Sequence, residues 1–126
     1  PSVENTLLVL YDCKPKQAVY FVNWNEDNTG KEEIWTQGQG KYSSHWVPSF
    51  DDMNEKVEFD LDIIFDSRYT VIANGKLIAE KQDQGVTVWS FDMTQPMSSY
   101  LLAFAIGKYA KKQEFSSSGV PFSVYY

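Results

Sequence analysis

The chain has very few of the residues from which enzymes build metal and nucleophilic centres. Its 126 residues include one histidine, His45, and one cysteine, Cys13. A zinc-binding helix of the HExxH type needs two histidines four positions apart, so this sequence cannot form one. A zinc site made of cysteines and an internal disulfide are excluded as well, because Cys13 has no partner. No GxSxG motif is present to supply a serine nucleophile. We therefore expect no catalytic residue and no metal site in this chain.

Positive charge and long apolar runs are also scarce. Eleven Lys and Arg oppose seventeen Asp and Glu, which gives a net charge of −6 and a pI near 4.6. An acidic chain with scattered basic residues repels phosphates, so we expect no nucleic acid and no membrane among its partners. No run reaches the about 18 apolar residues of a membrane span, and residues 1–4 lack the regions of a signal peptide. The compartment stays open between cytoplasmic and periplasmic or secreted.

Short runs of apolar residues, many of them alternating, indicate β-strands instead. Residues 57–65 are apolar at odd positions and acidic at 58, 60 and 62, which predicts a strand with one buried and one solvated acidic face. Asn74-Gly75 predicts a two-residue type I′ hairpin turn, because both central residues of that turn take positive φ. Residues 86–91 predict the next antiparallel strand of a meander.

Other segments complete an all-β prediction. Residues 6–11 and 18–22 are apolar runs on either side of a polar linker, and they predict a hairpin. Residues 100–106 predict a buried strand. Residues 108–118 predict an edge strand with its loop, and residues 120–126 predict a last extended segment. Eight or so short strands with no strong helical stretch predict an antiparallel β-sandwich or a saddle-shaped sheet pair. We expect residues 1–126 to form a single β-domain.

Two glutamines on glycine-rich backbone are the best candidates for a binding site. Gln37 and Gln39 lie two positions apart, so an extended backbone would point both carboxamides the same way, each with one acceptor and an NH₂ donor group. Gly38 and Gly40 would let another molecule approach the main chain closely. Composition alone favours a simpler interpretation, in which the glutamines stabilise a turn. We expect His45 to form a hydrogen bond on a strand beside this loop and not to act as a base.

Three motifs, in the same order, resemble the amino-terminal domain of the M1 family of zinc aminopeptidases. They are WTQGQ at 35–39 with SHWVPSFD at 44–51, YTVIANGKL at 69–77, and PMSSYLLAFAIG at 96–107. Together they cover most of the chain, although Ser49 and Met53 stand where the family often has Cys and Pro. The resemblance implies a β-saddle whose first strands precede this chain. It also implies that zinc and the catalytic domain belong to another part of the same polypeptide.

The resemblance also assigns roles to the glutamine loop. It implies that Gln37, Gly38 and Gln39 bind a peptide substrate, with Gln37 lining the pocket for the first side chain and Gln39 contacting the α-amino group or backbone. The family more commonly has Glu at the second position, and the charge-assisted hydrogen bond of Glu is about twice as strong as a neutral one. The expected function is therefore a substrate-positioning domain of a zinc aminopeptidase, with no cofactor in this chain and no catalysis by the chain alone.

Two functions of other classes stay open. The parent polypeptide could be a scaffold that has lost its zinc ligands, in which case this domain mediates protein contacts. The sequence after Tyr126 would decide, because an HExxH motif there would indicate an enzyme. Four Trp, eight Tyr and eight Phe are also compatible with a carbohydrate-binding β-sandwich, although alternating strands bury most such residues as core. Retention on an insoluble polysaccharide would favour that function.

Overall fold

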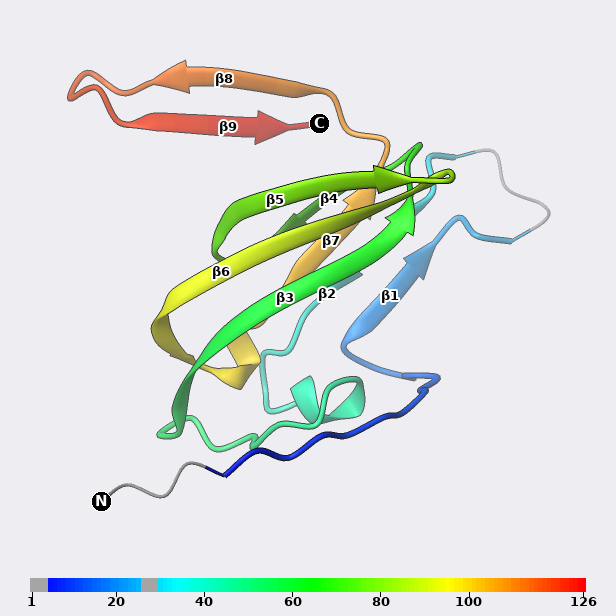
Figure 1. Ribbon diagram of the computed structural model, residues 1–126, viewed down its shortest axis with the longest axis vertical. Helices are drawn as coiled ribbons and strands as arrows, with labels where there is room; N and C mark the ends of the chain where they lie inside the picture. The colour runs from blue at the N-terminus through cyan, green and yellow to red at the C-terminus, as the bar shows by residue number, and fades with distance from the viewer. Residues whose placement is uncertain (1–4, 26–29) are drawn as a thin grey trace.

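Two antiparallel sheets face each other in the computed structural model, which describes residues 5–25 and 30–126 (Figure 1). The four-stranded sheet has the order β1 (Val19–Val22), β2 (Glu33–Thr36), β7 (Phe104–Gly107) and β4 (Thr70–Ala73). The three-stranded sheet has the order β3 (Lys56–Asp66), β6 (Val86–Ser98) and β5 (Lys76–Asp83). A separate hairpin consists of β8 (Lys111–Phe115) and β9 (Pro121–Tyr125).

Two short 3₁₀ helices, η1 (Ser43–His45) and η2 (Ser99–Leu101), are the only helical elements in the described residues. No helix of this part of the chain is both long and apolar enough to cross a membrane. The prediction of an all-β antiparallel sandwich is confirmed. So are the edge strand predicted within residues 108–118 and the last extended segment, which are β8 and β9.

The core lies between the two larger sheets. Val71 and Ile106 of the four-stranded sheet and Trp89 and Phe91 of the three-stranded sheet belong to one buried cluster. Burying a side chain of this size stabilises the fold by about 1.5–3 kcal/mol. The alternation predicted for β3 is confirmed, because its odd positions from 59 to 65 are half-buried and its acidic positions 58, 60 and 62 are exposed. The apolar period of β3 therefore places its inner face against this cluster.

The hairpin predicted at Asn74-Gly75 is wrong. β4 pairs with β7, and β5 pairs with β6, so these two residues carry the chain from one sheet to the other. Only Gly75 of the two has a positive φ, of 89°. Two consecutive positive φ angles occur one strand later, at Gln84 (44°) and Gly85 (88°), which join β5 to β6 in a two-residue turn. The predicted meander is therefore reduced to the β5–β6 hairpin.

The strand predicted over residues 6–11 is also wrong. Residues 5–18 contain no strand, and the side chains of Leu7, Leu8 and Leu10 are 80–87% exposed. The segment is held by its end, where the Tyr11 hydroxyl donates to the Trp46 carbonyl at 3.0 Å. Its sequence suits a strand, but it pairs with none of the described strands. Only the second arm of that predicted hairpin forms, as β1.

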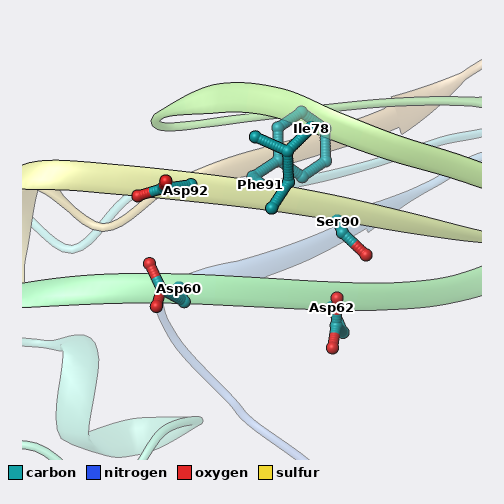
Figure 2. A pocket seen from close by; sticks show the side chains of 6 residues that line it. All are labelled: Asp60, Asp62, Ile78, Ser90, Phe91 and Asp92. Carbon is teal, nitrogen blue, oxygen red and sulfur yellow. The ribbon is translucent and has the colours of Figure 1, made fainter.

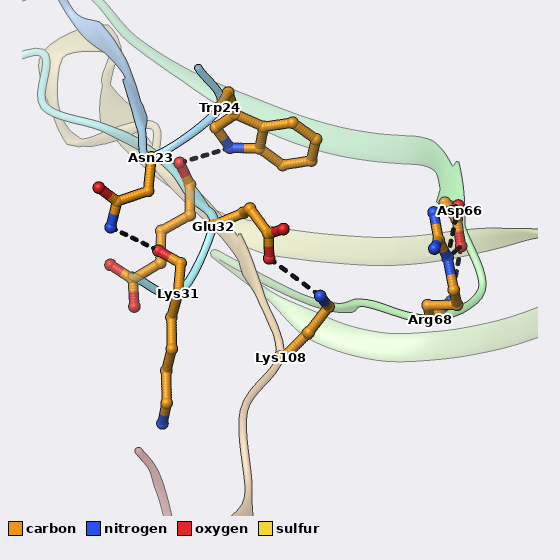
Figure 3. A network of polar contacts seen from close by, with 8 residues as sticks. Asn23, Trp24, Lys31, Glu32, Asp66, Arg68 and Lys108 are labelled. Carbon is orange, nitrogen blue, oxygen red and sulfur yellow. Dashed lines mark hydrogen bonds and ion pairs between the residues drawn. The ribbon is translucent and has the colours of Figure 1, made fainter. Parts of the chain in front are cut away.

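A polar network joins the β1–β2 loop, the β3–β4 turn and the segment that follows β7 (Figure 3). Arg68 pairs with Asp66 at 2.7 Å, and Lys108 pairs with Glu32 at 2.9 Å. The hydrogen bond from the Arg68 side chain lowers the pKa of Asp66 to about 2. Both cations also lie against the ring of Tyr69, at 5.9 Å for Arg68 and 5.1 Å for Lys108. Each cation is thus matched by a carboxylate, and the network serves to join the loops.

Candidate functional site

The three sequence motifs meet at one end of the four-stranded sheet. The end of β2, the end of β4 and the segment from η2 to β7 surround two adjoining concavities there. The first, which we call the glutamine pocket, has a volume of about 390 Å³ and is lined by Thr36, Gln37, Gly38, Gln39, Tyr100, Leu101 and Ala103. The second has about 300 Å³ and is lined by Trp35, Thr36, Ile72, Ala73, Asn74, Ala103, Phe104 and Ala105. Thr36 and Ala103 belong to both concavities.

The backbone of the glutamine loop is fixed by contacts within the chain. The Gln37 amide donates to the Ala18 carbonyl at 2.9 Å, and the Tyr42 amide donates to the Gly38 carbonyl at 3.1 Å. Gly38 is buried, and a Cβ at this position would lie 2.8 Å from the carbonyl oxygen of Tyr100. Contacts closer than about 3 Å force the neighbouring backbone to move. A glycine is therefore required here by the packing of the fold itself, and the close approach of another molecule to Gly38 stays a prediction.

The side chains of this loop are available for binding. Gln37 and Gln39 are exposed, and neither carboxamide forms a hydrogen bond to another of the described residues. A turn begins at Gln39, directly after Gly38. Both residues nevertheless line the same pocket. The structure thus brings together two unpaired amide groups, each able to donate and to accept, on a backbone that is already fixed.

Another wall of the glutamine pocket consists of Tyr100 and Leu101, to which the sequence assigned no role. These residues form most of η2, whereas a strand was predicted over 100–106, and only the part from Phe104 onward is a strand. The Ser43 hydroxyl donates to the Ser99 carbonyl at 2.7 Å and holds the start of η2. The signal for this wall was present in the third motif, but its folding into a turn of helix was not visible in the sequence.

His45 does not line the glutamine pocket. It lies in η1 and not on a strand, so its expected position is wrong; its amide donates to the Tyr42 carbonyl at 3.1 Å. Its ring lies edge-on to that of Tyr42, with centroids 5.7 Å apart. Asp51 accepts hydrogen bonds from the amide and the hydroxyl of Ser44. The described contacts therefore couple Asp51 to Ser44 and not to His45.

Within residues 5–25 and 30–126, no three side chains of His, Cys, Asp or Glu are placed to hold a metal ion. Cys13 is exposed, and its Sγ lies 3.7 Å from the Trp46 carbonyl oxygen. The described residues do not fit a zinc ion, and we assign no zinc-dependent step to them.

A further concavity of about 420 Å³ lies on the three-stranded sheet (Figure 2). Its carboxylates belong to Asp60 and Asp62 on β3 and to Asp92 on β6, and Asp60 stands directly opposite Asp92 in the strand register. Like charges at directly opposite positions repel each other. With Asp60 and Asp62 exposed, this surface is the acidic strand face that the alternation of β3 predicts.

Comparison with known proteins identifies relatives of this chain. Residues 4–101 match the family model described as the Peptidase M1 N-terminal domain. The chain is 36% identical to a leucyl aminopeptidase of Saccharolobus solfataricus over 76 residues, which cover 60% of this chain and 10% of that protein.

Two longer alignments agree. A glutamyl aminopeptidase of Rattus norvegicus is 28% identical over 84% of this chain, and a puromycin-sensitive aminopeptidase of Caenorhabditis elegans is 29% identical over 90%. The aligned parts are 11% and 12% of those two proteins. The chain thus spans about a tenth of the length of the curated relatives it matches.

Proposed function

Because this chain belongs to the M1 peptidase family, as part of its amino-terminal domain, we propose that it positions a peptide substrate for an aminopeptidase. The catalytic domain and its zinc ion then belong to another part of the same polypeptide. The observation that carries the proposal is the pair of exposed carboxamides, Gln37 and Gln39, on one wall of the glutamine pocket with no hydrogen-bond partner among the described residues. Relatives named as leucyl, glutamyl and puromycin-sensitive aminopeptidases support it.

The chemistry of the two amides suits the amino end of a peptide. In this proposal the carbonyl oxygen of Gln39 accepts a hydrogen bond from the substrate's α-ammonium group or backbone, and Gln37 contacts the first side chain. The fixed backbone of the loop means that little freedom is lost when these bonds form. The domain would accelerate cleavage by orienting the first peptide carbonyl toward the catalytic domain, since correct orientation alone lowers a reaction barrier.

Replacing both Gln37 and Gln39 with alanine in the full-length polypeptide should lower kcat/KM for aminoacyl substrates by about 10- to 100-fold. This range corresponds to the loss of one hydrogen bond to a charged group, about 1.5–3 kcal/mol. Hydrolysis of aminoacyl p-nitroanilides measures it. The matched control is Gln113→Ala, an exposed glutamine on β8 outside the pocket, which should leave the kinetics unchanged. Wild-type kinetics in the double variant would overturn the proposal.

The single variant Gln39→Glu tests the contact with the ammonium group. A carboxylate would convert a neutral hydrogen bond into a charge-assisted one of about twice the strength, so peptide affinity should rise about 3- to 10-fold. Inhibition constants of a short peptide with a free amino end would be compared with those of its N-acetylated form. Only the free peptide should gain affinity. An equal change for both peptides would mean that position 39 does not contact the ammonium group.

A further inference from the structure

Asn74 forms two hydrogen bonds to Ala103, one of the two residues that line both concavities. Its amide donates to the Ala103 carbonyl at 3.2 Å, and its side-chain Oδ1 accepts from the Ala103 amide at 2.5 Å. The last pair of the β4–β7 ladder is Ala73 with Phe104, so Asn74 and Ala103 stand at the next step. Asn74 thus extends the ladder by one step, with a side-chain oxygen in place of a backbone carbonyl.

The course of the chain explains why a side chain is used there. The backbone turns at Gly75, which has a φ of 89°, and continues toward the three-stranded sheet. A Cβ on Gly75 would lie 2.5 Å from the carbonyl oxygen of Asp92. The backbone therefore leaves β7 directly after Asn74, and no later carbonyl of this strand continues the ladder. Ala103 is half-buried, and an unpaired amide in such a position would be unfavourable. The short carboxamide of asparagine reaches back and satisfies it.

A second side chain holds β7 from its other edge. The hydroxyl of Thr36 on β2 accepts from the Phe104 amide at 2.9 Å. The start of β7 is thus held by Asn74 on one side and by Thr36 on the other. Each lies one step beyond the last pair of its ladder, β4–β7 for Asn74 and β2–β7 for Thr36. From this point the chain runs back through Leu102, which is 1% exposed, to the pocket wall at Tyr100 and Leu101. A displacement of Ala103 would consequently move that wall relative to the glutamines.

We propose that Asn74 is a positioning residue for the glutamine pocket. It does not line this pocket, but it fixes Ala103, which does, and so sets the spacing between the wall at Tyr100 and Leu101 and the amides of Gln37 and Gln39. The proposal rests on the proposed function of the pocket in binding peptide. Asn74 acts through the acceptor oxygen of its side chain, which gives the proposal a selective chemical test.

The test compares Asn74→Leu with Asn74→Asp in the full-length polypeptide. Leucine has nearly the shape of asparagine without an acceptor, whereas aspartate keeps the oxygen that receives the Ala103 amide. Asn74→Leu should raise KM for aminoacyl substrates about 10-fold and change kcat less than about twofold, since displaced binding groups weaken substrate binding. Asn74→Asp should leave KM within about twofold of the wild-type value, because the acceptor oxygen is retained. A purely structural role would reduce the folded fraction, and with it the apparent kcat, without changing KM.

Hydrogen exchange provides a readout that is independent of substrate. Exchange in a peptide covering residues 99–107 should be faster in Asn74→Leu and close to wild type in Asn74→Asp. Should Asn74→Leu not accumulate in folded form, Asn74→Ala also removes the acceptor of the Ala103 amide and should also raise KM. A wild-type KM in whichever of these two variants folds, or a failure of Asn74→Asp to restore KM, would overturn the proposal.

The double alanine variant at Gln37 and Gln39 separates this proposal from the one on which it rests. If that variant has a reduced kcat/KM while Asn74→Leu keeps the wild-type KM, the positioning role of Asn74 fails and the binding role of the pocket stands. If neither variant changes the kinetics, both proposals fail. A reduced kcat/KM in the double variant, together with a raised KM in Asn74→Leu that Asn74→Asp restores, supports both.

Discussion

Replacement of Gly75 by alanine should lower the free energy of unfolding by about 3 kcal/mol, because a left-handed backbone costs an L-residue about 1–2 kcal/mol and overpacking costs about 1–3 kcal/mol. Gly75 has a φ of 89°. A Cβ there would lie 2.5 Å from the carbonyl oxygen of Asp92 and 2.9 Å from the backbone nitrogen of Met93, both on β6. These are backbone atoms inside a paired strand, so they cannot rotate away. Urea denaturation followed by tryptophan fluorescence would measure the change.

Gly85 provides the matched control for this experiment. Its φ of 88° is nearly the same, but a Cβ there would meet no atom within 4 Å. Gly85→Ala should therefore lose only the conformational part, about 1–2 kcal/mol. If the two variants were equally stable, the close approach between the Gly75 crossover and β6 would contribute nothing to stability.

Replacement of Leu102 by alanine should destabilise the protein by about 3 kcal/mol, within the range of about 2–5 kcal/mol measured for buried leucines. Leu102 is 1% exposed and follows η2 in the short segment that leads to β7. Truncation to alanine would leave a cavity that the fixed ends of this segment cannot easily close. The same denaturation experiment measures the loss.

The neighbouring Leu101 is the control, since it has the same side chain and is 47% exposed. Leu101→Ala should change stability by less than about 1 kcal/mol, as is usual for exposed positions. A comparable loss in both variants would mean that the burial of Leu102 does not account for its contribution to stability.

The strands with a clear apolar period could be predicted from the sequence, whereas strand partners could not. The alternation in β3 is a property of its own residues, and it gives both the strand and its buried face. Asn74-Gly75 has the composition of a hairpin turn, but its geometry follows from Ala103 and Asp92, which lie far away in the sequence. Residues 6–11 have strand-like composition, yet a strand also needs a neighbour to pair with.

The candidate site shows the same division. Gln37 and Gln39 could be singled out from the sequence because neutral amides on a glycine-rich backbone suit binding, and their roles in binding were implied by the resemblance. Tyr100 and Leu101 could not, because the short segment between Pro96 and Gly107 indicates a buried strand, whereas residues 99–101 form a turn of helix. Its short helical turn is held by Ser43, whose hydroxyl bonds to Ser99 across 56 positions of sequence. Such long-range hydrogen bonds to the backbone leave no local pattern.

The unpaired glutamine side chains have a consequence for evolution and engineering. Because the backbone of their loop is held by main-chain bonds and by the packing of Gly38, the identities of residues 37 and 39 are not needed to keep the loop in shape. These two positions are therefore expected to tolerate saturation mutagenesis with little penalty in expression or folding, so the groups displayed in the pocket can be varied without altering its frame. Natural divergence can use the same freedom, since the supporting frame tolerates a change in the groups it displays.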